Sequence, residues 1–458
     1  MKYIDENRIN SLLTNTEKMG LKLDEILAKS RELKRLSLEE TAFLFSCDDK
    51  ADIEKILKTA EFVKNTIYGK RVVMFAPLYA SNICVNNCKY CSFRTDNKSI
   101  ERKALTVDEI KQQVLWLLKR GHKRILLVAG EAGAHGKKPI DFYIDCIEAI
   151  YSVVDGNNRI KRVNINCAPL TVDEFKRLKN AGIGTFQIFQ ETYHNETYKN
   201  MHPSGPKSDA DNRISAVDNA FEGGIDDIGM GVLYGLYDYK FETLALLMHI
   251  EALEKIHGVG PHTISVPRLE PAFGVDFSKD KYHFLKDEEF EKLVAILRLA
   301  VPYTGIILST RESAEMRDKL LNLGVSQVSA ESATAPGGYG ENNDNTQFCI
   351  SDNRTLDEMI ESIIKSGSIP SFCAACYRSN RTGKAFMEIA KPGNIKGKCQ
   401  INGLITLKEY LDDFASEEVK EKGNKLIAAE IEKLSAEDRK LVDDFFKEIK
   451  AGKRDKFV

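Results

Sequence analysis

The fold is decided in the stretch Val72-Val-Met-Phe-Ala-Pro-Leu-Tyr-Ala80, which is followed by Cys84-Val-Asn-Asn-Cys88-Lys-Tyr-Cys91. Its first half is a short, continuous apolar run of the kind that forms a fully buried strand. Similar runs recur along the chain and, with 72–80, predict eight strands: 124–130, 162–167, 185–192, 227–235, 263–269, 305–312 and 325–331. Helical stretches lie between nearly all of them, and alternating strands and helices require a parallel sheet. Eight such units within ~260 residues predict an α/β fold, a closed (β/α)8 barrel of the TIM type.

Helix starts and stops divide the rest of the chain. Thr106-Val-Asp-Glu109 and Thr171-Val-Asp-Glu174 have the pattern of capping boxes, and Gly121 and Gly182 stand where the matching helices should end. We expect an N-terminal helical extension over residues 1–70, the barrel over 71–335, and a mostly helical C-terminal region over 336–458. The C-terminal region contains Cys373, Cys376 and Cys399, which are expected to be metal ligands.

Composition excludes several classes of function. The 458 residues carry 66 Lys and Arg against 68 Asp and Glu, a formal net charge of -2 that gives no general attraction to nucleic acid or to an anionic membrane. No apolar run approaches the ~18 residues of a membrane span, and the first residues lack the apolar core of a signal peptide. We therefore expect a cytoplasmic protein, in which ten cysteines indicate metal binding or catalysis rather than disulfides.

The loop after the first predicted strand has the spacing C-x3-C-x2-C, formed by Cys84, Cys88 and Cys91. Three thiolates on one short loop can hold three irons of a 4Fe-4S cube and leave the fourth iron open to another ligand. The alternatives are buried free thiols or a structural zinc site, but zinc requires a fourth ligand and the nearest histidine along the chain is His122.

This loop resembles the cluster motif of the radical S-adenosylmethionine (SAM) enzymes, including the aromatic Tyr90 before the last cysteine. The resemblance implies that the open iron chelates SAM and that an electron from the cluster cleaves SAM to a 5′-deoxyadenosyl radical. Gly130-Glu131 matches the superfamily's Gly-Glu motif, with Ala129 in place of a first glycine, and implies a contact with the SAM amine. Arg213 matches an arginine that pairs with the SAM carboxylate. A loop carboxylate and an exposed helix arginine are the plain alternatives.

A second cysteine triad lies in the C-terminal region. Cys373-Ala-Ala-Cys376 is followed after 22 residues by Cys399, and all eight histidines lie at or before His283. A structural zinc site would therefore need Cys349, a carboxylate or a non-local group as its fourth ligand.

Together these motifs resemble the HydG family, the tyrosine lyases that mature FeFe hydrogenases, from about residue 70 to the end. The related thiamine-pathway lyase shares Gln190-Glu-Thr-Tyr193 and Leu308-Ser-Thr-Arg-Glu312 but lacks the second triad. The resemblance implies cleavage of L-tyrosine to p-cresol and dehydroglycine, then conversion of dehydroglycine to carbon monoxide and cyanide at a second Fe-S cluster. It also implies an electron donor such as ferredoxin or flavodoxin, and other hydrogenase maturation proteins as partners.

Further site residues follow from the barrel and the family. Arg311 and Ser329 end the seventh and eighth strands and can converge on an amino-acid carboxylate. Gln190, Glu191 and Thr192 end the fourth strand and are expected to face SAM or tyrosine. The family holds an extra iron of its second cluster partly through a histidine, and His262 is the candidate. The alternatives are ordinary strand-end polar groups and a structural histidine.

Two other functions remain open at this point: a 2-iminoacetate synthase for thiamine assembly, and a non-catalytic Fe-S carrier. Gly130-Glu131 and Arg213 argue against the carrier, because a scaffold has no need to grip SAM. The first triad belongs at the carboxyl ends of the strands. We expect the second triad at the far end of the cavity, with a polar internal channel between them.

Overall fold

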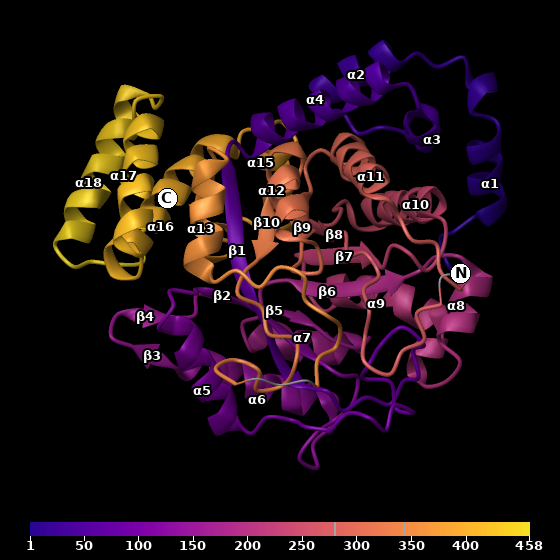
Figure 1. Cartoon of the computed structure of the whole chain (residues 1–458), viewed down its shortest axis with the longest axis horizontal. Helices are drawn as coiled ribbons and strands as arrows, with labels where there is room; N and C mark the ends of the chain where they lie inside the picture. The colour runs from indigo at the N-terminus through magenta and orange to yellow at the C-terminus, as the bar shows by residue number, and fades with distance from the viewer. Residues whose placement is uncertain (279–280, 342–344) are drawn as a thin grey trace.

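The computed structural model describes residues 1–278, 281–341 and 345–458, and eight parallel strands form its centre (Figure 1). They pair in the order β10-β9-β8-β7-β6-β5-β2-β1, and pairing of β1 with β10 closes the sheet into a barrel. The predicted (β/α)8 barrel is thus confirmed. Its strands are β1 (Arg71–Ser81), β2 (Arg124–Ala129), β5 (Arg162–Asn166), β6 (Phe186–Glu191), β7 (Ile228–Val232), β8 (Thr263–Ser265), β9 (Gly305–Leu308) and β10 (Gln327–Ser329).

Three short strands were not predicted. β11 (Ile369–Ser371) pairs in parallel with the start of β1, and β3 (Val154–Asp155) with β4 (Asn158–Arg159) forms a separate hairpin. Strands of two or three residues are too short to show a hydrophobic period, so sequence patterning cannot detect them. β11 joins the C-terminal region to the barrel at the amino end of β1.

Helices alternate with the barrel strands and cover them. Thr106 and Thr171 make the expected capping boxes with Glu109 and Glu174. Gly121 and Gly182 adopt positive φ at the ends of these helices. The helices after successive strands are α5 (Val107–Leu118), α6 (Pro139–Ser152), α7 (Val172–Asn180), α8 (Asn195–Met201), α9 (Ala210–Glu222), α10 (Tyr239–His257), α11 (Asp287–Ala300) and α12 (Ala314–Leu323).

The N-terminal extension is helical, as expected, and wraps one side of the barrel (Figure 1, indigo). Its helices α1 (Glu6–Thr14), α2 (Leu23–Arg31), α3 (Leu38–Ser46) and α4 (Lys50–Ile67) pack mainly on α10 and α11. Within the described residues, no helix has both the length and the apolar character needed to cross a bilayer.

The C-terminal region lies at the left of Figure 1 (orange to yellow), where α16 (Lys396–Asp413) packs on β11 and β1. The long helices α17 (Glu417–Ile431) and α18 (Ala436–Lys450) lie outside α16, away from the barrel. The region comprises α13 (Leu356–Lys365), α14 (Ala375–Arg378), α15 (Gly383–Ala390), α16 (Lys396–Asp413), α17 (Glu417–Ile431) and α18 (Ala436–Lys450).

Candidate active site

The carboxyl ends of the barrel strands, here called the mouth, surround a cavity of about 190 Å³ that is open to solvent. Cys84, Cys88 and Cys91 all line it, on the loop that follows β1. This loop is held by backbone hydrogen bonds from Asn87 to Ser204 (3.2 Å) and from Lys89 to Met201 (3.0 Å). Burial raises the pKa of Cys88 to about 12 and that of Cys91 to about 11, so these groups stay protonated thiols until a metal displaces the proton.

The thiols of this loop fit a cluster better than a single ion. Among the residues that the structure describes, no three thiol, imidazole or carboxylate groups converge closely enough to ligate one metal ion. In a 4Fe-4S cube each thiolate binds a different iron, so its ligands stand farther apart than those of one zinc ion. The donor set, three thiols around one cavity, is what a cube with one open iron requires.

Glu131 and Arg213 form a buried ion pair beside the cysteines. An Arg213 guanidinium nitrogen lies 2.8 Å from Glu131 Oε1, and Asn86 Nδ2 donates to Glu131 Oε2 at 2.6 Å. Burial alone would raise the pKa of Glu131, but Arg213 and Lys207 hold it below its usual value, so the carboxylate is charged. Gly130, next to Glu131, lets the backbone at Ile83 in the loop after β1 come close to the end of β2, because a Cβ there would lie 2.2 Å from the Ile83 carbonyl oxygen.

Glu191 lines the cavity together with Gln187 and Phe189, the other β6 residues on the same side of the strand, and β6 ends irregularly at this point. The register of β6 against β7 shifts between Phe189 and Glu191, and Glu191 has a φ of +71°. Its Oε1 accepts from Lys207 Nζ at 2.7 Å and lies 3.7 Å from Arg213. Non-glycine residues seldom adopt this left-handed backbone, and such strain is frequent at functional sites.

The alternation of side chains along β6 corrects the expectation for the two neighbours of Glu191. Gln190 does not line the cavity; its Nε2 donates to the Ala210 carbonyl and to Met1 Sδ, each at 3.3 Å. Thr192 is fully buried outside the cavity and its hydroxyl donates to Glu242. Successive side chains on a strand point in opposite directions, so three consecutive residues cannot all face one cavity.

Tyr90 lines the cavity beside Cys88, as the cluster motif predicts. Its hydroxyl lies 2.8 Å from His202 Nε2, while His202 Nδ1 lies 2.9 Å from the Tyr198 carbonyl oxygen. Burial and the nearby Lys207 lower the pKa of His202 to about 2, so the imidazole is neutral. A neutral imidazole with one N–H toward Tyr198 leaves Nε2 to accept from Tyr90 and fixes the orientation of its ring.

Arg311 and Ser329 line the other side of the cavity. Arg311 donates weakly to the Arg268 carbonyl at 3.4 Å, and its guanidinium carbon lies 3.5 Å from the centre of the Phe348 ring. Within the described residues no carboxylate pairs with Arg311. A guanidinium in a cavity without an acidic partner can bind the carboxylate of a ligand.

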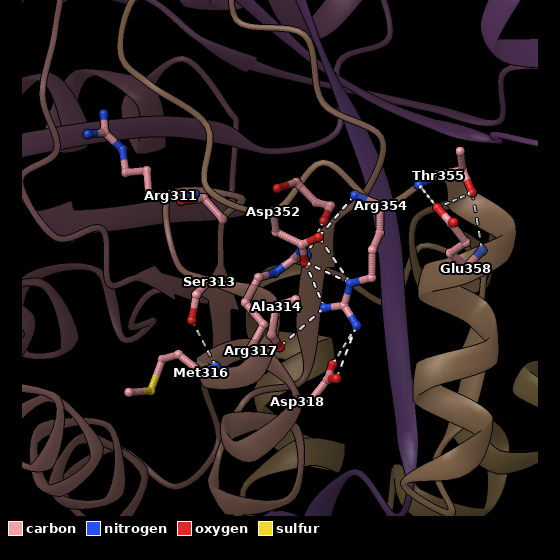
Figure 2. Close-up of polar contacts among 12 residues, drawn as sticks. Arg311, Ser313, Ala314, Met316, Arg317, Asp318, Asp352, Arg354, Thr355 and Glu358 are labelled. Carbon is pink, nitrogen blue, oxygen red and sulfur yellow. Dashed lines mark hydrogen bonds and ion pairs between the residues drawn. The ribbon is translucent and has the colours of Figure 1, made fainter.

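Below Arg311 lies a buried network of ion pairs that the sequence did not reveal (Figure 2). Arg317 donates to Asp352 and to the carbonyl oxygen of Ser329, and Arg354 donates to Asp352 (2.7 Å) and Asp318 (2.9 Å). Figure 2 shows Arg311 turned away from this network. The network fixes the end of β10 without occupying the guanidinium of Arg311.

The second triad lies at the amino ends of the strands, here called the floor. Cys373, Cys376 and Cys399 line a separate cavity of about 40 Å³ together with Arg71 and Arg124, the first residues of β1 and β2. Arg124 donates to the Cys373 carbonyl at 2.7 Å. The two triads therefore lie at opposite ends of the barrel. Cys349, the possible fourth zinc ligand, is exposed and donates its backbone N–H to Pro271, beyond the carboxyl end of β8.

His262 precedes β8 and lines the floor cavity with the second triad. Its Nδ1 lies 3.5 Å from Asp227 Oδ2, and its ring packs on Phe386 at 4.1 Å between centroids. Burial lowers the pKa of His262, so the imidazole is neutral. A histidine whose one nitrogen faces a carboxylate presents the other as a metal ligand, a common arrangement in metalloproteins.

Some cavity residues were missed by sequence reasoning. Lys207 belongs to a single turn, Pro206–Ser208, and Gln347 and Phe348 follow the barrel in a stretch without regular structure. None of them sits in a periodic segment or a spaced motif. Asn86 could have been predicted, because it is a polar residue between the two proposed cluster ligands Cys84 and Cys88.

Two protein-family models match successive parts of the chain. Residues 78–250 match the Radical SAM superfamily, and residues 265–369 match the Biotin and Thiamin Synthesis associated domain. The 2-iminoacetate synthase of Salmonella typhimurium is 30% identical over 320 residues, which cover 69% of this chain and 82% of that protein. The Escherichia coli 2-iminoacetate synthase is 29% identical over 338 residues, or 73% and 86%.

Two solved structures are similar over almost the whole chain, the C-terminal region included. HydG described as a maturase of the [FeFe]-hydrogenase is 45% identical, with a TM-score of 0.95 and 100% of both chains covered. The FeFe-hydrogenase maturase HydG from Carboxydothermus hydrogenoformans is 40% identical, with a TM-score of 0.82 and coverage of 96% of this chain and 99% of that one. With this identity over both cysteine-bearing ends of the barrel, the chain belongs to the HydG family of the radical SAM superfamily.

Proposed function

We propose that this protein is a radical SAM carbon-carbon lyase that cleaves L-tyrosine between Cα and Cβ at the mouth. The products of that step are p-cresol and dehydroglycine. Dehydroglycine is then converted to carbon monoxide and cyanide at the floor, for assembly of the FeFe-hydrogenase H-cluster. The observation that carries this proposal is the placement of two cysteine triads at opposite ends of one barrel.

The mouth residues suit SAM. Cys84, Cys88 and Cys91 would hold a 4Fe-4S cluster, which supplies the electron that cleaves SAM to a 5′-deoxyadenosyl radical. Glu131 is held as a carboxylate and can accept from the SAM amine, while Arg213 can pair with the SAM carboxylate. The existing ion pair of 2.8 Å thus matches the opposite charges of a bound amino-acid group.

The mouth also suits tyrosine. Arg311 lacks an acidic partner in the described residues and can take the substrate carboxylate in a bidentate pair, with the Ser329 hydroxyl lining the same cavity. Aromatic residues such as Phe75, Tyr79 and Phe189 line the remaining wall. These side chains exclude water from a reactive radical and give a flat substrate ring apolar surfaces to pack on.

The floor residues suit a second Fe-S cluster. Cys373, Cys376 and Cys399 would be its ligands, and His262 would hold an extra iron through the nitrogen that does not face Asp227. Ser329 lines the mouth cavity and Gln327, two residues earlier on β10, lines the floor cavity. Only one layer of side chains therefore separates the two cavities along β10, which supports an internal route for dehydroglycine.

The electron for the mouth cluster must come from a donor such as ferredoxin or flavodoxin, and the products are destined for other hydrogenase maturation proteins. The reducing cytoplasm is the compartment that keeps exposed thiolate clusters intact.

Product analysis tests the proposal. The reconstituted chain is incubated anaerobically with L-tyrosine, SAM and dithionite, and p-cresol, 5′-deoxyadenosine, carbon monoxide and cyanide are measured. We expect all four from the wild type. Cys376→Ala should still make p-cresol and lose carbon monoxide, because it removes a ligand at the floor and leaves the mouth intact.

The same experiment separates the second candidate, a 2-iminoacetate synthase. That candidate is favoured by the identity of 29–30% to two such enzymes. It predicts p-cresol without carbon monoxide or cyanide from the wild type, and no effect of Cys376→Ala on the products. A carrier would make none of the four. Loss of p-cresol in Cys376→Ala with an intact mouth cluster would show that the C-terminal region is needed to assemble the radical site.

A further inference from the structure

We propose that Gln347 and Phe348, adjacent residues beyond the barrel, position the two halves of the mouth: Gln347 the cluster ligand Cys91, and Phe348 the arginine Arg311. The segment that carries them, residues 345–352, is here called the strap. The proposal rests on the proposed function in taking the mouth as the site of a cluster and of a substrate carboxylate.

The strap crosses the mouth and is tied to several of its loops. Ser92, one residue after the last cluster cysteine, donates its hydroxyl to the carbonyl groups of Thr346 (2.5 Å) and Gln347 (3.1 Å). Backbone hydrogen bonds join the strap to the loops after β10, β8 and β9: Gln347 N to Thr334 O (2.9 Å), Cys349 N to Pro271 O (2.9 Å) and Ser351 N to Thr310 O (2.9 Å). Its position is therefore set by the same loops that carry the site.

Gln347 directs an amide N–H at a cluster ligand. The Tyr79 hydroxyl donates to Gln347 Oε1 at 2.7 Å, which fixes the orientation of the amide and turns Nε2 toward Cys91 Sγ at 3.8 Å. The side chains of Tyr79, Gln347 and Cys91 all line the mouth cavity. Hydrogen bonds to the sulfurs of an Fe-S cluster stabilise its reduced, more negative state and raise its reduction potential. Gln347 would thus act on the cluster through Cys91 without binding iron.

Phe348 holds the guanidinium of Arg311. The guanidinium carbon lies 3.5 Å from the centre of the ring, the distance of a stacked cation–π contact. The Thr334 hydroxyl donates to the Phe348 carbonyl at 3.2 Å and fixes the backbone at this point. Within the described residues, the guanidinium of Arg311 makes one hydrogen bond, a long one of 3.4 Å to Arg268 O. Stacking on a ring occupies the face of the guanidinium and leaves its N–H edge for a carboxylate.

The end of the strap is anchored where Figure 2 shows the ion-pair network. Asp352 is buried and accepts from Arg317 and Arg354, and Arg317 also donates to the Ser329 carbonyl. This anchor ties the strap to β10, the strand that carries Ser329. The side chains of Gln347 and Phe348 are thereby held in place relative to Cys91 on one side of the mouth and to Arg311 and Ser329 on the other.

The Gln347 half is tested by reduction potential. Gln347→Leu removes the N–H donor, and the potential of the mouth cluster is measured in the full chain by redox titration of the electron paramagnetic resonance signal that shifts on SAM addition. We expect a more negative potential than in the wild type. Tyr79→Phe, which only frees the amide to rotate, should shift it less in the same direction.

The matched control is Gln113→Leu. Gln113 on α5 exchanges hydrogen bonds with the backbone of Tyr339, in the segment before the strap, at 2.8 and 3.1 Å. Its change to Leu removes the same amide group without removing a contact to a cysteine. It should leave the potential unchanged. A folded Gln347→Leu that holds no iron at the mouth would also support the contact with Cys91. An unchanged potential in Gln347→Leu, with full iron content, would overturn this half.

The Phe348 half is tested by tyrosine binding without a reductant, so that no turnover occurs. Phe348→Leu should weaken tyrosine binding roughly three- to thirty-fold, the range of a desolvated cation–π contact, and leave SAM binding unchanged. Phe348→Tyr keeps the ring face and should restore most of the affinity. Unchanged tyrosine affinity in Phe348→Leu would overturn this half. The division of roles would fail if Gln347→Leu and Phe348→Leu lowered both the reduction potential of the mouth cluster and the tyrosine affinity to the same extent.

These readouts are independent of the reaction itself. If the wild type made no p-cresol, the proposed function would fail, yet the potential shift in Gln347→Leu would still be measurable. If the wild type made p-cresol and neither strap variant changed its readout, the inference alone would fail.

Discussion

The mouth and the floor of the barrel differ in how their charges are balanced. At the mouth, Arg213 pairs with Glu131 and Lys207 pairs with Glu191, and Arg311 alone among the three lacks an acidic partner in the described residues. At the floor, the buried Arg71 has no hydrogen bond or ion pair within the described chain, and Arg124 donates only to a carbonyl. The mouth thus contains two paired cations and one unpaired cation, whereas neither arginine of the floor cavity has an acidic partner in the described residues.

This difference has a physical origin in the two triads. A buried charge without a partner is costly, so Arg71 requires an anionic group in the assembled protein. Three thiolates with their irons would supply one: burial raises the pKa of Cys399, and Arg71 opposes that rise. The mouth cysteines lie beside Lys207, which already has its own carboxylate. The floor therefore depends on its cluster for charge balance more than the mouth does.

The largest expected effect separates the two triads outright. Changing Cys84, Cys88 and Cys91 together to Ala should abolish 5′-deoxyadenosine formation, because the floor triad has no access to SAM bound at the mouth. Iron and sulfide analysis of the same variant should still find the floor cluster. Undiminished SAM cleavage would refute the assignment of the mouth triad.

A smaller effect is expected from the unpaired guanidinium of the mouth. Arg311→Ala removes a bidentate partner whose hydrogen bonds to a charged group are typically worth ~1.5–3 kcal/mol. Tyrosine affinity should weaken by roughly ten- to a hundred-fold, at ~1.4 kcal/mol per decade. SAM affinity, measured in parallel, is the control, since Glu131 and Arg213 are untouched. Unchanged tyrosine dependence with intact SAM binding would place the carboxylate site elsewhere.

Sequence alone predicted the barrel, and it singled out most of the polar residues that the structure gathers into the two cavities. All eight barrel strands coincide with apolar runs, and the cysteine spacings by themselves indicate metal binding. His262 and the second triad are far apart in the chain, and the structure brings them into one cavity. His262 reaches this end because it precedes β8, whereas the triad reaches it because β11, which precedes Cys373, pairs with the start of β1.

The failures also have a physical cause. Gln190 and Thr192 were assigned to the cavity because they end the fourth strand together with Glu191. The side chains of Gln187, Phe189 and Glu191 take the cavity side of the strand, so their neighbours face away from it. Gln347 and Phe348 lie in a segment without period or motif, and only the closing of the chain over the mouth gives them a role. Backbone irregularities and crossing segments are set by tertiary contacts, which a single sequence does not display.

The smallest expected effect concerns the group that holds the irregular turn at Glu191. Glu242 on α10 accepts from the Thr192 hydroxyl and from the Tyr193 backbone N–H (2.7 Å), and burial raises its pKa to about 8. The folded protein therefore keeps a proton that the unfolded chain, with an ordinary glutamate, releases above pH ~4.3. Stability from this group is full below that pH and is lost as the pH rises through about 8.

Glu242→Gln, a neutral isostere, should remove this part of the pH dependence. Buried Lys64, near the floor, has a pKa lowered by burial to about 7 and gives the opposite slope above that pH, so the comparison is made between pH 5 and 7. Buried histidines with lowered pKa values, such as His202 and His249, contribute equally to wild type and variant there and cancel in the difference. Across this window, wild-type unfolding free energy should fall by ~1–2.5 kcal/mol more than that of the variant. In thermal melts this is a difference of a few degrees in the pH-induced shift of the apparent Tm. Lys64→Met is the control at the floor and should match the wild type in this window. Parallel pH profiles of wild type and Glu242→Gln would mean that Glu242 is ionised in the folded protein, and that the turn carrying Glu191 is held by a charged carboxylate instead.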